Sequence, residues 1–584
     1  MAASADMDAP APPITRPQAV LAAALLALHA GLALHQAARQ APTYDEPYYA
    51  PAGLAHLVRG EQRLNPEHPP VVKLWLGASW LGAGLPDLRA VPGFAAHDQW
   101  TFGPSLLYRD PARVQGLLLR ARASVVLLSV LLGLGVLWMG RRAFGPEAGL
   151  LALALYALDP LVVANAGLAT LDLGTAAAIF AAVALSWAAL DRGGAGRLAG
   201  AAAATGLALG AKGTGLVVLP ALALLVLAPL LRAGGARAGE LGVRGRRALA
   251  VAAGGAVVLS VACLPEGPRA WWTSIARQQA HARAGHAAWA AGVQSTTCMP
   301  WYFPFAWAVK TPLPVLAASA AGLALLLSRI RREPARAVAV AGPPALLVAA
   351  ALASGICNGV RQLLPATPFL AVAGGAALGA LWRTGRSGRA ASLLAVAWMG
   401  AALVRVHPDA ITWSNELAGG PSRTWTRLTD SNVDWGQSLG QVADALRGEP
   451  VRTVWLDYFG TAWPPAHGLP AIRKVQDWRF RAGAVLPVPR RDGPDPAGRE
   501  IVAVSATCLV DAYVAETDLH AWLRERTPWR WAGNSIALFD VTGDAAAYRS
   551  LARMAERMRD PLTAAEARTR AAEIERDRAG RPGP

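Results

Sequence analysis

The chain has 584 residues, of which 54% are hydrophobic and 16% are charged, and its formal net charge is +17. Since an average soluble domain has about 25% charged residues, this composition excludes a disordered protein. The four cysteines exclude a disulfide-rich scaffold and a CxxC metal site. Cys298 and Cys357 both fall in segments predicted to lie outside the membrane, where they either pair or remain free.

The apolar residues form long uncharged blocks, such as 123–140 and 213–231. These blocks match or approach the ~20 residues that cross a bilayer. The sequence therefore predicts a polytopic α-helical membrane protein. About eleven spans are expected, at 19–38, 123–140, 148–166, 173–190, 198–211, 213–231, 248–265, 309–328, 336–354, 363–382 and 389–405.

The positive charge is concentrated in short loops between these blocks. Arginines far outnumber acidic residues at 141–147, 191–197, 232–247, 328–336 and 383–389. Short arginine-rich loops stay in the cytoplasm during insertion, so the charge indicates topology and not a nucleic-acid partner. The first span has little charge before it and no clear cleavage site, which favours a retained anchor over a signal peptide.

An odd number of spans and a cytoplasmic amino terminus place 39–122, 266–302 and 406–584 on the outer side. In a bacterium this is the periplasmic face of the inner membrane. We expect a transmembrane domain at 1–405, a small α/β domain at 406–545 and a charged helical tail at 546–584. The α/β domain is predicted because the β-rich runs VRTVWLDYFG, REIVAVSATCLV and NSIALFDV alternate with helical stretches.

Ionisable residues at the outer ends of the spans are the candidate functional groups, because charge near a bilayer is costly. Asp45 and Glu46 lie in TYDEPYY just after the first span. A capping box with Thr43 explains Glu46 but not Asp45. A carboxylate among tyrosines at the edge of a membrane also suits a general base, because partial desolvation raises its proton affinity.

The same outer loop contains Glu67, His68 and Lys73 in the run NPEHPPVVK. These residues suit a metal ion or a phosphate headgroup, although Lys73 alone is also explained by snorkelling. Asp172 is the sole charge of the next outer turn. It is either an ordinary helix cap or part of a carboxylate cluster with Asp45 and Glu67.

Basic residues occur at the same predicted level: Lys212, Lys310 and Arg361. Each alone is compatible with snorkelling. Together they run against the positive-inside bias, so an anion is a plausible reason for them. Among apolar spans, that anion suggests a lipid-linked phosphate.

The succession TYDEPYY, NPEHPPVVK, TLD, KTPLP, RQLLPATP and DSNVDWGQSL resembles membrane glycosyltransferases of the GT-C fold. It is similar to glycosyltransferase family 39, with bacterial relatives of the protein O-mannosyltransferases and of the lipid A aminoarabinose transferases. The resemblance covers about residues 20–540. It implies a polyprenyl-phosphate-linked sugar donor, no nucleotide cofactor, and an acceptor outside the membrane that the sequence does not identify.

The resemblance also assigns roles to residues. It implies Asp45 as general base beside Glu46, Asp172 as the second-loop aspartate, and a divalent metal ion shared by Glu67 and Asp172. The family's phosphate-binding lysine is replaced by His68, so that role passes partly to Lys73, while Arg361 is retained. Pro47 and Tyr48 replace the arginine that commonly follows the DE pair, and Gln362 replaces an aromatic residue.

Two other classes of function are compatible with many spans and few charges. A transporter or flippase of a lipid-linked envelope precursor predicts ionisable residues near the bilayer midplane, whereas here they are expected at one face. A non-catalytic scaffold for envelope assembly predicts that Asp45 is dispensable. The sequence favours the enzyme.

Overall fold

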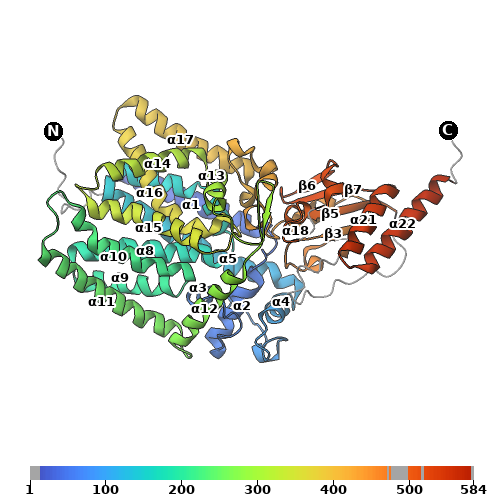
Figure 1. Cartoon of the computed structure of the whole chain (residues 1–584), viewed down its shortest axis with the longest axis horizontal. Coiled ribbons are helices and arrows are strands. Elements are labelled where there is room, and N and C mark those ends of the chain that lie inside the picture. Colours follow the sequence, from blue (N-terminus) through green and yellow to red (C-terminus); the bar gives the residue numbers. More distant parts are fainter. Residues whose placement is uncertain (1–13, 470–471, 475–496, 515–517, 580–584) are drawn as a thin grey trace.

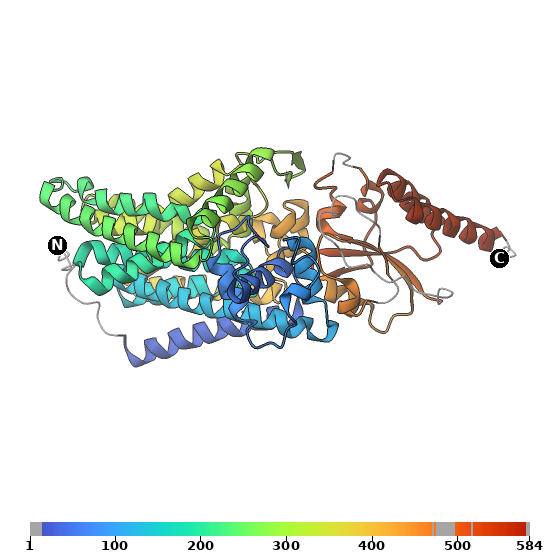
Figure 2. The same cartoon turned by 90° about the horizontal axis from the view of Figure 1, so that it is seen from below.

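The apolar blocks form long helices that run side by side, as the computed structural model shows (Figures 1 and 2). The structure describes residues 14–469, 472–474, 497–514 and 518–579. In this part, eight helical segments are long and apolar enough to cross a membrane: Arg16–Arg39, Pro111–Phe144, Leu171–Arg192, Gly213–Leu231, Ala238–Ala262, Pro334–Ala353, Val360–Trp382 and Arg386–Val406. The predicted polytopic helical membrane protein is confirmed.

The main helices of these segments are α1 (Arg16–Arg39), α5 (Val114–Phe144), α8 (Leu171–Arg192), α10 (Val218–Leu227), α11 (Ala238–Ala262), α15 (Pro334–Ala353), α16 (Thr367–Trp382) and α17 (Arg386–Val406). Two bent pairs add to them: α6 (Pro146–Ala157) with α7 (Pro160–Ala166), and α13 (Tyr302–Lys310) with α14 (Leu313–Ser328). Each bend coincides with a proline, which cannot continue a helix without losing a hydrogen bond.

The number of spans differs from the prediction of about eleven. Counting each bent pair as one span gives ten in the described part of the chain. The span expected at 198–211 is α9 (Ala195–Leu209), which has 15 residues. At 1.5 Å per residue it falls short of a bilayer core of about 30 Å, although it packs between α8 and α11.

The centre of the helical bundle is formed by α8 and α16, which are largely buried, whereas α1, α11 and α17 lie at the periphery. Helices that are apolar on all sides are expected in such a centre. The residues at the beginnings of the two central segments therefore lie inside the protein and not in lipid.

Three short helices fill the first long connection: α2 (Glu46–Arg59), α3 (Val71–Ala78) and α4 (Gln99–Leu107). The second long connection contains α12 (Pro268–Ala284) and a hairpin of β1 (Ala288–Ala290) and β2 (Val293–Ser295). Cys298 and Cys357 form a disulfide. This bond settles the alternative left open by the sequence and ties the second connection to the segment before α16.

The carboxyl-terminal region is a mixed α/β unit at the end of the bundle opposite the amino terminus of the described chain (Figure 2). Its sheet has the order β4-β3-β5-β7-β6. β3 is parallel to β4 and β5, whereas β7 is antiparallel to β5 and β6. The strands are β3 (Val451–Asp457), β4 (Ile472–Lys474), β5 (Arg499–Ser505), β6 (Arg530–Ala532) and β7 (Ile536–Asp540).

The three β-rich runs of the sequence correspond to β3, β5 and β7, while β4 and β6 were not predicted. Helices of this region are α18 (Leu439–Leu446), α19 (Ala506–Leu509), α20 (Ala521–Arg524), α21 (Ala545–Arg557) and α22 (Pro561–Ala579). The charged segment after residue 545 thus forms two helices. α21 packs on the sheet through Tyr548, whose hydroxyl lies 3.3 Å from the indole nitrogen of Trp455.

A buried charge cluster lies in this region. The imidazole of His520 lies between two carboxylates, with Nδ1 2.7 Å from Asp511 and Nε2 2.8 Å from Asp457. Arg524 contacts Asp511 at 2.8 Å. Burial alone would lower the pKa of His520, but the two carboxylates raise it to about 9. The histidine is therefore charged at neutral pH and balances one aspartate while Arg524 balances the other.

Candidate functional site

Four of the ionisable residues selected from the sequence meet at one end of the helical bundle. Asp45 lies between α1 and α2, and Asp172 is the second residue of α8. Lys212 follows α9, and Arg361 lies in the 3₁₀ turn Val360–Ala366 that leads into α16. Because these segments begin or end at the same level, residues separated by more than 300 positions in the sequence become neighbours.

Arg361 links the two aspartates. Its Nη1 lies 3.1 Å from Oδ2 of Asp172 and 3.7 Å from Oδ2 of Asp45. Lys212 binds the other oxygen of Asp172 at 2.7 Å. Asp172 is therefore held by two cations, whereas Asp45 has a looser ion pair and keeps 23% of its side chain exposed.

The environment of Asp45 favours its protonated form. Burial raises the pKa of this carboxyl, and the raising effect exceeds the lowering effect of Arg361. Tyr49 donates a hydrogen bond of 3.2 Å to Oδ2 of Asp45. The charged groups that face Asp45 are Arg361, Asp172, Asp430 and Lys212. A carboxylate with raised proton affinity is suited to accept a proton from a hydroxyl.

The neighbouring Glu46 is in a different environment. It is buried, and Arg122 of α5 binds both of its oxygens at 2.7 Å. The backbone amides of Thr43 and Ala169 also donate to it at 2.7 Å. Burial alone would raise the pKa of Glu46, but Arg122 and these donors hold it below its usual value. Glu46 therefore joins three segments of the chain.

The bond from the Thr43 amide is one half of the predicted capping box. The other half is absent, since the Thr43 hydroxyl also donates to Glu46 instead of capping the helix. Arg122 in addition donates to the carbonyls of Ala37, Gln40 and Ala41. It thereby satisfies acceptors at the end of α1 that have no partner within the helix.

His68 and Asp45 both lie close to the hydroxyl of Tyr49. Its Nε2 is 3.5 Å from the Tyr49 hydroxyl, and its Nδ1 is 2.9 Å from Nε2 of Gln278. Burial lowers the pKa of His68 well below its usual value, and Lys212 lowers it further. The imidazole is therefore neutral at pH 7 and offers a hydrogen bond in place of a charge.

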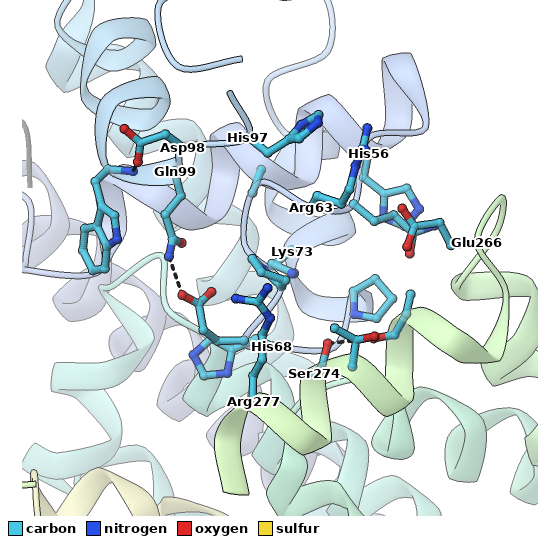
Figure 3. A pocket seen from close by; sticks show the side chains of 18 of the residues that line it. His56, Arg63, His68, Lys73, His97, Asp98, Gln99, Glu266, Ser274 and Arg277 are labelled. Atoms are coloured by element: carbon cyan, nitrogen blue, oxygen red, sulfur yellow. Dashed lines mark hydrogen bonds between the residues drawn. The ribbon is translucent and has the colours of Figure 1, made fainter. Parts of the chain in front are cut away.

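Glu67 and Lys73 line a cavity of about 460 Å³ between the α2–α3 connection, α4 and α12 (Figure 3). Glu67 accepts hydrogen bonds from Asn65 at 3.2 Å and Gln99 at 2.5 Å. The ammonium of Lys73 donates to the carbonyl of Asn65. Burial lowers the pKa of Lys73 to about 7. The exposed Arg277 adds a further cation to the wall of this cavity.

Close backbone packing joins α2 and α3 at the wall of this cavity. A Cβ atom at Gly53 of α2 would lie only 1.7 Å from the carbonyl oxygen of Lys73. Only glycine permits this approach. The same contact fixes α3, which carries Lys73, against α2, which begins just after Asp45.

Lys310 is not part of this cluster. Its buried ammonium donates to the backbone carbonyls of Ile411 at 2.7 Å and Asn432 at 2.5 Å. These bonds attach the end of α13 to the segment that follows α17. The structure thus gives Lys310 a structural environment and not a place beside Asp172.

The donor set expected for a metal ion does not converge. Both oxygens of Asp172 are bound by Lys212 and Arg361, and Glu67 is held by two amides. Within the described residues there is no group of three or more His, Cys, Asp or Glu side chains suited to a metal ion. The residues present therefore do not fit the implied metal site.

Sequence reasoning missed several residues that build the site: Tyr49, Arg122, Arg277, Gln278 and Ser431. Tyr49 was noted only as one of several aromatic neighbours. An arginine at the outer boundary of α5 was a usable signal for Arg122, since it too runs against the positive-inside bias. No local pattern marks Arg277, Gln278 or Ser431.

Comparison with known proteins gives structural similarity only. No protein-family model matches the chain, and no curated protein matches it in sequence. ArnT from Cupriavidus metallidurans, solved with bound undecaprenyl phosphate, is similar over 89% of this chain and 97% of its own, with 15% identity and a TM-score of 0.45. The oligosaccharyltransferase AglB from Archaeoglobus fulgidus, solved with an inhibitory peptide and a dolichol-phosphate, is similar over 78% of this chain and 64% of its own. Its identity is 12% and its TM-score 0.46.

Proposed function

We propose that the chain is a membrane glycosyltransferase that moves a sugar from a polyprenyl-phosphate carrier to an acceptor outside the membrane, with Asp45 as general base. The observation that carries the proposal is the contrast between two adjacent carboxylates. Glu46 is enclosed by Arg122 and backbone amides, whereas Asp45 is partly exposed beside Arg361. Of these two carboxylates, Asp45 is the one with exposed surface to offer a substrate.

The chemistry of such a transfer matches these groups. A sugar on a polyprenyl phosphate already has a good leaving group, so the enzyme must deprotonate the acceptor hydroxyl and stabilise the departing phosphate. Asp45 takes the proton. Arg361 and Lys212 both contact Asp172, and Arg361 also contacts Asp45. From this position the two cations can offset the charge of the phosphate.

The remaining candidates take supporting roles. His68 and Lys73 line the cavity of about 460 Å³, and we assign them to contacts with the phosphate or the sugar. Asp172 and Glu46 hold the cations and backbone around the site, and Glu67 shapes the cavity. In-line attack by the acceptor inverts the anomeric carbon, because no covalent sugar–enzyme intermediate is required.

The placement of the charges supports an enzyme over a transporter. Asp45, Asp172, Lys212 and Arg361 all lie at the ends of their helical segments, and a transporter site is expected near the bilayer midplane. The arginine-rich loops lie at the opposite ends of the same helices. We therefore assign the site to the periplasmic face of a bacterial inner membrane, with the amino terminus in the cytoplasm.

A deletion strain complemented with variants tests this proposal. Mass spectrometry of envelope glycans, glycoproteins and lipids should show one class of molecule that lacks a hexose or pentose. Wild type should restore it, and Asp45→Asn should not, although the variant is inserted at the wild-type level. Asp87→Asn serves as the matched control, since Asp87 is an exposed carboxylate paired with Arg59 on the surface.

Two results would count against the assignment. Normal sugar transfer by Asp45→Asn would remove the proposed base. Accumulation of a fully glycosylated molecule on the wrong side of the membrane in the deletion strain would instead indicate a transporter.

A further inference from the structure

The segment 430–435, which joins α17 to the carboxyl-terminal α/β unit, touches Arg361 on two sides. Nε of Arg361 donates a hydrogen bond of 3.0 Å to the hydroxyl of Ser431. The guanidinium carbon lies 4.1 Å from the centroid of the Trp435 ring, which is the geometry of a cation–π contact. These contacts leave Nη1 directed at Asp172 and Asp45.

The segment itself is held firmly against the start of the Arg361 turn. The side-chain oxygen of Asn432 accepts the amide of Val360 at 2.9 Å, and its nitrogen donates to the Tyr302 hydroxyl at 2.9 Å. A Cβ atom at Gly359 would lie 2.0 Å from the hydroxyl oxygen of Ser431. A side chain at position 359 would therefore collide with Ser431, so this approach of the two segments requires glycine.

The buried Lys310 adds to this attachment. Its ammonium binds the carbonyl of Asn432, and that interaction replaces the water that the charge loses on burial. These contacts restrict the rotamers of Arg361 and keep its guanidinium close to Asp45. The segment 430–435 thus contributes to the geometry of the site, and its own Asp430 is one of the charged groups that face Asp45.

From these contacts we infer that Ser431 and Trp435 are positioning residues, which hold the Arg361 guanidinium where it can meet the phosphate of the lipid donor. The inference rests on the proposed function, because it assigns that phosphate to Arg361. Neither residue touches Asp45 or Asp172 in any contact that the structure records, so their effect passes through Arg361.

Equilibrium binding of undecaprenyl phosphate to the purified full chain in detergent tests the inference. Trp435→Leu and Ser431→Ala should each weaken binding about tenfold, which is within the range reported for desolvated cation–π contacts and for hydrogen bonds to charged groups. Trp435→Phe keeps an aromatic face and should restore most of the affinity. Trp425→Leu and Ser422→Ala are matched controls, since Trp425 packs on Trp531 and Ser422 is exposed.

A double-mutant cycle separates positioning from general support of the fold. If Trp435 acts through Arg361, Trp435→Leu should cause no further loss of affinity in an Arg361→Gln background. A purely structural role predicts a lower thermal midpoint and unchanged affinity of the folded fraction, and that result would overturn the inference. If wild type itself does not bind undecaprenyl phosphate, the proposed function fails and this inference fails with it.

Discussion

The buried pair of Glu46 and Arg122 makes a sharp prediction about two neighbouring residues. Asp45→Asn should leave the protein folded and abolish sugar transfer, whereas Glu46→Gln should destabilise the fold. The side chains of Glu46 and Arg122 are both fully buried. Removing one partner of such a pair typically costs about 3–5 kcal/mol, because the other charge stays buried without compensation.

The structure indicates why glutamine is a poor substitute. Glu46 accepts five hydrogen bonds, from Arg122, Thr43 and Ala169. A side-chain amide has one oxygen and an NH₂ group. The NH₂ group of glutamine would therefore face N–H or O–H donors that bind a carboxylate oxygen in the wild type. Replacing the pair with Glu46→Leu and Arg122→Met together should recover only part of the loss. The carbonyls at the end of α1 that Arg122 binds would still lack a partner.

Thermal unfolding of the full chain in detergent measures this effect, with Asp45→Asn as the matched variant one position away. The stabilisation by Glu46 depends on its ionised form, whose pKa in the folded protein is lowered. The contribution is therefore present above the usual pKa of about 4.3 and is lost as the pH falls through the lowered value. If Glu46→Gln unfolds at the wild-type temperature and yet loses transfer, the structural role argued for Glu46 is refuted.

Three further predictions concern charge and cross-linking. Arg361→Gln removes a cation that lowers the pKa of Asp45, so the rising limb of the pH–rate profile should move to higher pH; an unmoved limb would show that Arg361 does not act on Asp45. The charged His520, whose pKa rises from 6.5 to about 9 on folding, should stabilise fully below pH 6.5, and the gain should vanish as the pH rises through 9 in thermal scans of wild type against His520→Gln. Cys298→Ser with Cys357→Ser should lower the free energy of unfolding by about 2–4 kcal/mol, and alkylation of the wild type without reductant should leave Cys298 and Cys357 unmodified because they are paired in a disulfide.

Much of the membrane domain follows from sequence because its signals are local. A run of apolar residues and an arginine-rich loop each occupy a short stretch of sequence. These signals predicted most of the long helices and which helix ends lie at the same end of the bundle. The prediction of about eleven spans exceeded the ten because 198–211 is apolar enough but forms a helix of only 15 residues. Hydropathy alone does not set where a helix ends.

The site was only partly predictable for a related reason. Asp45, Asp172 and Arg361 could be selected because each is a charge out of place among apolar residues. Their partners are not out of place: Tyr49 is one of several tyrosines, and Ser431 is an ordinary polar residue in a turn. Lys310 has the same unusual pattern as Arg361, yet its ammonium binds backbone carbonyls. A charged residue among apolar ones must have a partner for its charge. The sequence pattern does not reveal whether that partner is a ligand or the backbone.

The charge balance of the cluster suggests how donor binding and proton transfer are coupled in the proposed reaction. Arg361 pairs with Asp45 and Asp172, Lys212 pairs with Asp172, and Asp430 is a third carboxyl group that faces Asp45. A phosphate that binds Arg361 competes with Asp45 for the same guanidinium and adds negative charge beside it. Both effects raise the proton affinity of Asp45. If the proposed reaction is correct, we expect Asp45 to become a stronger base when the donor is bound, which couples deprotonation of the acceptor hydroxyl to the presence of the donor sugar.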